Sequence, residues 1–252
     1  MFNQSDIQAK LDPDDPWFGL IEEAYCVFDY PKPTSTEVCI RCCMDRKIEN
    51  DFFNPPIREL PLRYVQDWFF AAYDPPGIAK GTWAYLLPRI LEILAAGEDP
   101  APVALEVSLS RFQTGNRANW SNKEWQVLDR FQREFLRRKV AEGSDDLDGV
   151  LCMFRLAGWP LTDLLDQVAS MATALLAERF WRDWCEGHAP GREDVWITPF
   201  WESPDNSQVF EFYTSPAMYE RFSSLALSDD ADRALAEKAM AVAAVIETHV
   251  SS

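Results

Sequence analysis

Three of the six cysteines of this 252-residue chain lie within five positions, as Cys39-Ile-Arg-Cys42-Cys43. Two thiolates separated by two residues form one half of a typical structural zinc site, which needs four thiolate or imidazole ligands. Cys39, Cys42 and Cys43 are therefore candidate metal ligands, but no second pair completes the set. The other residues that could supply a fourth ligand are Cys26, Cys185 and His188. We expect no resident cofactor, with zinc at this cluster as the alternative.

Redox, hydrolytic and transfer chemistry have less support. A thioredoxin-like use of the cysteines needs a strand before them within a βαβ pattern, and none is visible. The two histidines, His188 and His249, lie in a loop beside Gly187 and near the C-terminal end. The chain has no glycine-rich phosphate loop, no GxSxG and no HExxH motif. The sequence thus favours a protein without a catalytic site, with an enzyme that has its cleft near Trp83, Arg89 and Glu92 as a third alternative.

Two runs of carboxylates, Asp145-Asp146-Asp148 and Asp229-Asp230-Asp232, resemble short metal-binding loops in composition. Each comes directly before an expected helix, where negative charge interacts favourably with the helix dipole. We interpret both runs as part of helix N-termini, with Ser228 as the cap of the last helix.

The charge balance is the second strong signal. The chain holds 41 acidic and 24 basic residues, a formal net charge of -17. This charge repels nucleic acids and anionic membranes and favours a basic protein partner, although solubility alone also accounts for it. Residues 187–252 are especially acidic, with 11 acids and 4 bases. No apolar stretch is long enough to cross a bilayer, and residues 1–11 do not read as a secretory signal, so we expect a cytoplasmic protein.

Apolar residues at helical spacing, punctuated by proline and glycine, predict helices along most of the chain. Ser121 and Glu124 form a capping-box pattern before the longest one. Pro88 lies inside an expected helix over 80–96, which is either kinked or split. Residues 195–214 fit either a β-hairpin or a short helix, and we favour the helix. The prediction is an all-α array of antiparallel helical hairpins in one compact domain, 1–252, with one short β-hairpin near 195–214 as the alternative. The other expected helices cover residues 16–28, 60–71, 103–112, 147–157, 161–169 and 174–186 and the C-terminal segment.

The cysteine segment, Pro56-Ile-Arg-Glu-Leu-Pro61, Gly81-Thr-Trp83 and Leu86-Leu-Pro-Arg-Ile-Leu-Glu92 together resemble a family of uncharacterised helical bacterial proteins. The resemblance covers about the first half of the chain and implies a helical fold, but no activity. The function that we predict is a non-catalytic, acidic protein-binding module, such as a toxin-neutralising inhibitor of the immunity type. The alternative is a zinc-stabilised scaffold or regulatory module that uses Cys39, Cys42 and Cys43. The sequence does not determine the oligomeric state.

Overall fold

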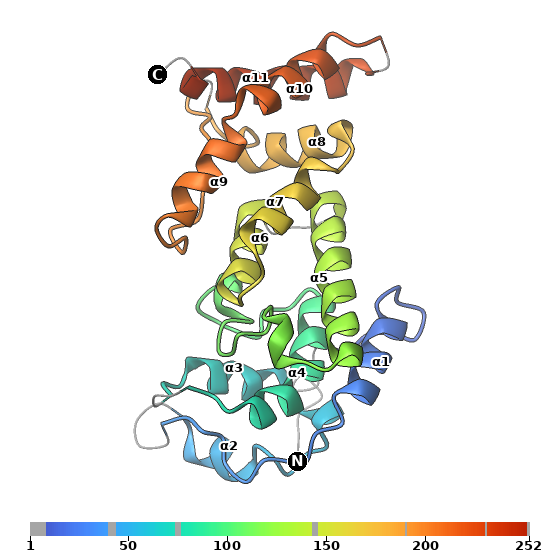
Figure 1. Cartoon of the computed structure of the whole chain (residues 1–252), viewed down its shortest axis with the longest axis vertical. Coiled ribbons are helices and arrows are strands. Elements are labelled where there is room, and N and C mark those ends of the chain that lie inside the picture. Colours follow the sequence, from blue (N-terminus) through green and yellow to red (C-terminus); the bar gives the residue numbers. More distant parts are fainter. Residues whose placement is uncertain are drawn as a thin grey trace. The chain divides into compact units, whose positions relative to one another are not determined.

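The computed structural model describes residues 9–39, 44–73, 77–142, 146–189, 191–229 and 231–250 (Figure 1). It confirms the predicted all-α class, and the described residues contain no β-strand. Val38 and Tyr73 form an isolated antiparallel bridge. The helices are α1 (Phe18–Val27), α2 (Arg46–Asp51), η2 (Ile57–Glu59), α3 (Leu62–Phe70), α4 (Lys80–Ala95), η3 (Leu105–Val107), η4 (Arg117–Asn119), α5 (Asn122–Glu142), α6 (Leu147–Leu156), α7 (Leu161–Ala169), α8 (Thr173–Trp184), α9 (Asp205–Tyr213), α10 (Pro216–Ala226) and α11 (Arg233–Val250).

The chain divides into two compact units. Unit 1 comprises Met1–Phe135 and Leu156–Trp159, and unit 2 comprises Leu136–Arg155 and Pro160–Ser252. The single domain over 1–252 stays a prediction. Along the described part of the chain, no helix is both long and apolar enough to span a membrane.

The core of unit 1 is built around α4. This helix runs without interruption through Pro88 and is buried along most of its length, since apolar residues occupy nearly every position from Trp83 to Leu94. The indole ring of Trp83 packs against Trp68 and Phe69 of α3, with ring centroids 6.2 and 6.3 Å apart. The burial of these large rings supplies much of the hydrophobic stabilisation of the unit.

A buried ion pair fastens α4 to its surroundings. Arg89 is 1% exposed, and its Nη1 donates to Glu92 Oε2 over 2.7 Å. The same guanidinium donates to the backbone oxygens of Leu60 and Ala9, and the Tyr25 hydroxyl donates to Glu92 Oε2 over 2.7 Å. Burial, followed by the charge of Glu92, raises the pKa of Tyr25. The group links four segments of unit 1, which is a structural role.

The core of unit 2 contains an aromatic cluster formed by α8, α9 and α10. Phe180 and Trp184 of α8 stack with centroids 4.3 Å apart, and Phe180 meets Tyr213 of α9 and Phe222 of α10 edge to face. α11 packs against both α8 and α10. The spacing of four between Phe180 and Trp184 places both rings on one face of α8, which is why this face is buried.

Two local predictions are wrong. Residues 103–112 do not form an α-helix but a 3₁₀ turn, Leu105–Val107, followed by further turns. Ser228 does not cap the last helix, because α11 begins only at Arg233 and the Ser228 backbone oxygen accepts from the Ala231 nitrogen before the helix starts. The cap is Asp232, whose Oδ1 accepts from the Leu235 nitrogen over 2.9 Å.

The capping box is confirmed. The Ser121 nitrogen donates to Glu124 Oε2 over 2.6 Å, and the Glu124 nitrogen donates to Ser121 Oγ over 3.4 Å. Tyr30 donates to the other oxygen of the same carboxylate over 2.6 Å, so the box also ties the segment after α1 to the start of α5.

Candidate functional site: an acidic face around α9

Of the three predicted metal ligands, the structure describes only Cys39. Cys39 is half-buried, and its backbone nitrogen donates to the Ala72 oxygen over 2.6 Å. Cys42 and Cys43 lie outside the described residues. Cys26 is exposed on α1, whereas Cys185 is buried in unit 2. Within the ranges that the structure describes, no three His, Cys, Asp or Glu side chains are grouped so that they could hold a metal ion.

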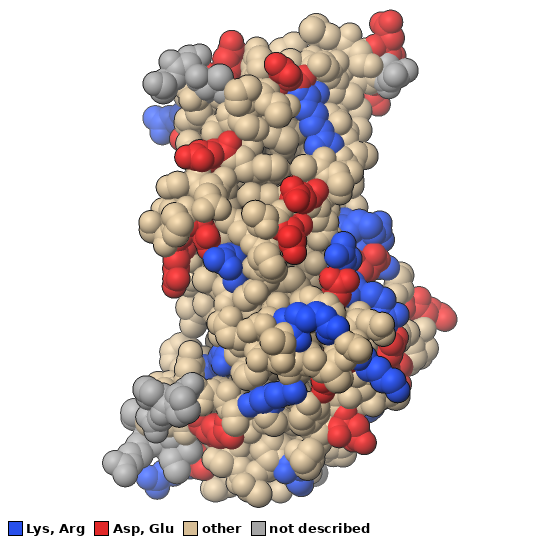
Figure 2. All heavy atoms as spheres, viewed as in Figure 1, with Lys and Arg blue, Asp and Glu red and all other residues tan. Residues whose placement is uncertain are grey.

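Two basic residues of α5 are engaged with nearby acids. Arg130 forms an ion pair with Glu23 of α1, and Arg133 forms one with Asp129 over 3.0 Å. These pairs are solvent-exposed and contribute little stability, but they occupy the charges that an anionic ligand would need. In Figure 2, Lys and Arg side chains gather over α5, whereas the part that holds α8 to α11 shows fewer of them.

The strongest charge imbalance lies in unit 2, in the stretch of sequence that connects α8 to α11. Residues 186–232 contain ten acidic residues and two arginines. One of these arginines, Arg221, donates to the oxygens of Ala169 and Met171 and to Thr173 Oγ1, so its charge serves the connection between α7 and α8. Five carboxylates of the stretch are exposed and form no ion pair with a described cation: Glu186, Glu202, Glu211, Glu220 and Asp229. We refer to Glu202 and Glu211, together with α9 and residues 195–201, as the acidic face.

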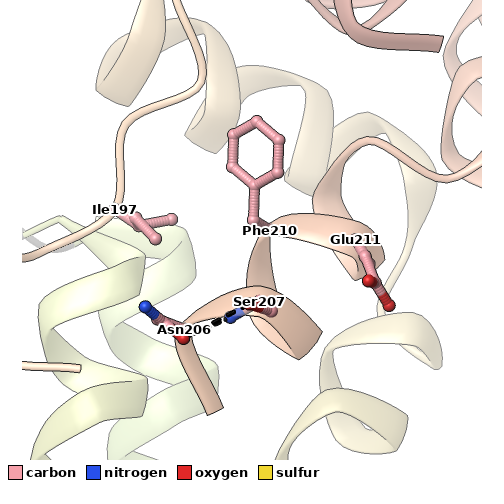
Figure 3. A pocket seen from close by; sticks show the side chains of 5 residues that line it. All are labelled: Ile197, Asn206, Ser207, Phe210 and Glu211. Atoms are coloured by element: carbon pink, nitrogen blue, oxygen red, sulfur yellow. Dashed lines mark hydrogen bonds between the residues drawn. The ribbon is translucent and has the colours of Figure 1, made fainter. Parts of the chain in front are cut away.

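A shallow pocket of about 340 Å³ opens in this face. Ile197 borders it from the irregular segment before α9, and Asn206, Ser207, Phe210 and Glu211 line it from α9 itself. Figure 3 shows Ile197 and Asn206 approaching each other across the hollow, while the carboxylate of Glu211 extends outward on another side of α9. The indole of Trp196, next to Ile197, is 45% exposed. The pocket thus combines apolar walls with polar atoms and has a large exposed aromatic ring beside it.

The residues of this face are held from beneath by Asp148 of α6, which is 3% exposed. Its Oδ2 accepts from the Thr198 nitrogen over 2.6 Å and from Trp201 Nε1 over 2.8 Å. Its Oδ1 accepts from the Tyr213 hydroxyl over 3.1 Å. One carboxyl group therefore connects α6 both to the 195–201 segment and to the end of α9.

Further contacts hold the two ends of the face. Arg155 Nε of α6 donates to Asp205 Oδ2 over 2.5 Å at the start of α9. The ring of His249 lies edge-on to Phe210 with centroids 5.2 Å apart, and its Nε2 is 2.7 Å from Asp194 Oδ1. His249 thus connects α11 to the face.

Residues 195–214 form no β-hairpin. The first part, 195–204, is irregular, and α9 covers Asp205–Tyr213, so the favoured helical prediction is confirmed. Sequence reasoning missed Asp148 as a central residue because it assigned the run Asp145-Asp146-Asp148 to helix capping. Asp146 does behave in this way, since its Oδ1 accepts from the Gly149 nitrogen over 2.6 Å. Asp148 lies two residues further into the helix and faces the interior.

Comparison of the chain with models of known protein families, with characterised proteins and with solved structures gave no match.

Proposed function

We propose that the protein is a non-catalytic binding module that recognises a basic protein partner through the acidic face. The observation that supports this role is the pocket at α9, which has Glu211 in its lining, the exposed Glu202 and Trp196 on the segment before α9, and no ion pair to either carboxylate from a described cation. Unpaired surface charge of one sign accelerates encounter with a partner of opposite charge and selects against partners of like charge. Exposed aromatic rings next to such charge provide contact area at the centre of an interface.

The partner class that fits best is a basic toxin or a similar harmful protein that the module neutralises. Neutralisation requires only tight coverage of the partner, so it needs no catalytic residue and no cofactor. We place this function in the cytoplasm of a bacterium, in line with the sequence resemblance. A zinc-stabilised scaffold is not favoured by any contact among the described residues.

Capture at low ionic strength followed by charge reversal tests the proposal. The immobilised protein is used to recover partners from a bacterial lysate, and the affinity of each recovered protein is then measured against two double variants. Glu202→Lys with Glu211→Lys reverses two charges of the acidic face, whereas Glu59→Lys with Glu98→Lys makes the same change in net charge on exposed positions of unit 1.

We expect a basic partner whose affinity falls roughly tenfold or more in the first variant, stays near the wild-type value in the second, and decreases with added salt. Equal affinity of both variants for every recovered protein, or recovery of no basic protein, would show that the face is not a binding surface.

A further inference from the structure

Asp148 is an unusual group to find at the base of a surface site. It is a carboxyl group buried within unit 2, and its three hydrogen-bond donors belong to the two elements that form the acidic face. Thr198 follows Ile197 directly, and Tyr213 ends the helix that carries Phe210. Any change in the state of this carboxyl group therefore acts on both walls of the pocket.

The charged groups around Asp148 do not neutralise it. Asp146, just before α6, adds a further negative charge, and Arg155 of α6 is engaged with Asp205 of α9. On α8, Arg179 forms its ion pair with Asp183. The packed segment 195–201 contains no ionisable side chain, and α9 contributes the neutral hydroxyl of Tyr213.

The surroundings consequently favour the neutral acid. Burial raises the pKa of Asp148 from 3.8 to about 7, against the opposing effect of the hydrogen bonds from Thr198, Trp201 and Tyr213. A carboxyl group with this pKa changes its charge near neutral pH.

We propose that Asp148 is a proton-controlled latch, which holds residues 195–201 against α6 and α9 when it is neutral and releases them when it ionises. The role of this latch in partner binding rests on the proposed function, but its effect on the conformation of the segment does not. In the latched state Ile197 faces α9 and the pocket is formed. Release of the segment lets water reach the carboxylate and removes that wall of the pocket.

The direction follows from linkage. The pKa of the buried group lies above that of the hydrated group, so the latched state binds more protons than the released state. The equilibrium constant for release should rise about tenfold per pH unit between about pH 4 and pH 7, and then level off. A higher pH therefore favours release, and a lower pH favours the formed pocket.

Hydrogen exchange of the 195–201 amides between pH 4.5 and 8.5, corrected for the intrinsic exchange rate, measures this release directly. In the wild type we expect protection to fall with rising pH up to about 7, while the amides of α11 keep theirs. Asp148→Asn is the matched variant, because the amide oxygen can accept from Thr198 and Trp201 and the amide nitrogen can donate to Tyr213. Protection in this variant should not depend on pH.

Tyr213→Phe provides a second variant that keeps the aromatic packing. It removes a hydrogen bond that stabilises the ionised carboxylate, so the pH at which the profile levels off should move upward. The same pH profile in wild type, Asp148→Asn and Tyr213→Phe would overturn the latch.

A binding experiment with decalysine as the probe separates the latch from the proposed function. At constant ionic strength, the wild type should bind the probe more weakly at pH 8.0 than at pH 5.5, and Asp148→Asn should show a smaller difference. If the probe binds at neither pH while protection still depends on Asp148, the acidic face is not a binding site for cationic chains and the latch stands. If the probe binds with one pH dependence in both proteins, the latch plays no part in binding, and the hydrogen-exchange profiles alone decide whether it acts on the segment.

Discussion

Replacement of Gly115 by alanine is a sharp test of the packing in unit 1. Gly115 is buried, and its nitrogen donates to the Ala157 oxygen over 2.8 Å. A Cβ atom at this position would lie 2.5 Å from Cδ2 of Trp159 and closer still to Cε3 and the backbone nitrogen of that residue. Real Cβ atoms essentially never approach other heavy atoms so closely.

The size of the effect follows from what would have to move. The Trp159 side chain is 4% exposed and stacks on Trp125 with centroids 6.1 Å apart, so it has little freedom to rotate away. The backbone contact can be relieved only by displacing the chain around Gly158. Overpacking of a core costs about 1–3 kcal/mol, and we expect a loss at the upper end of this range, about 3 kcal/mol.

Urea unfolding followed by tryptophan fluorescence measures the loss, with a lower midpoint and an unchanged slope expected. Gly81→Ala is the matched control, because Gly81 is exposed in the first turn of α4 and a Cβ there meets no atom within 4 Å. Alanine in place of an exposed helical glycine should stabilise by about 0.5–1 kcal/mol. If Gly115→Ala is as stable as the wild type, the close approach of residues 115 and 159 is not a feature of the folded protein.

Four further predictions concern single groups. Arg89→Met should reduce the free energy of unfolding by about 3–5 kcal/mol, because it leaves a buried carboxylate without its cation, and urea unfolding measures this loss. Asp148→Asn should be more stable than the wild type at pH 8 but not at pH 4. The raised pKa of Asp148 stabilises the wild type below about pH 4, and this stability is lost, at up to about 1.4 kcal/mol per pH unit, as the pH rises to about 7. Thermal unfolding of both proteins across this range shows whether the difference between them grows with pH. Cys185 should react with iodoacetamide at pH 8 far more slowly than the exposed Cys26, since burial raises the pKa of its thiol to about 11, and peptide mass mapping over time checks the order. The protein purified with reduced thiols should contain less than about a tenth of an equivalent of zinc, whereas one equivalent that is lost in Cys39→Ser would establish the zinc scaffold instead.

The helical class could be predicted because the signals that specify it are local. The capping box at Ser121 and Glu124 and the apolar spacing of α8 each specify structure within one or two turns. The same reasoning gave wrong predictions where more than one local structure or cap was compatible with the sequence. Residues 103–112 contain apolar residues at helical spacing, yet Pro102 and the following turns leave only a 3₁₀ helix. Ser228 and Asp232 are both good caps, and only the folded chain shows which one is used.

The candidate site was harder to predict for a physical reason. An aspartate next to a helix start reads the same in sequence whether it caps the helix or faces the core. Asp148 is distinguished by donors at positions 198, 201 and 213, which are 50, 53 and 65 residues away along the chain. No local pattern encodes such a convergence.

The sequence by itself determined the helical class and the excess of negative charge toward the C-terminal end, because helix periodicity and charge are sums over neighbouring or individual residues. Only the tertiary structure decided which carboxylates remain exposed without a cation and which one is buried, because burial depends on chain segments that meet from far apart. The cysteine cluster was the most conspicuous chemical pattern in the sequence. The contacts of the described residues instead direct attention to α9 and to the buried acid beneath it.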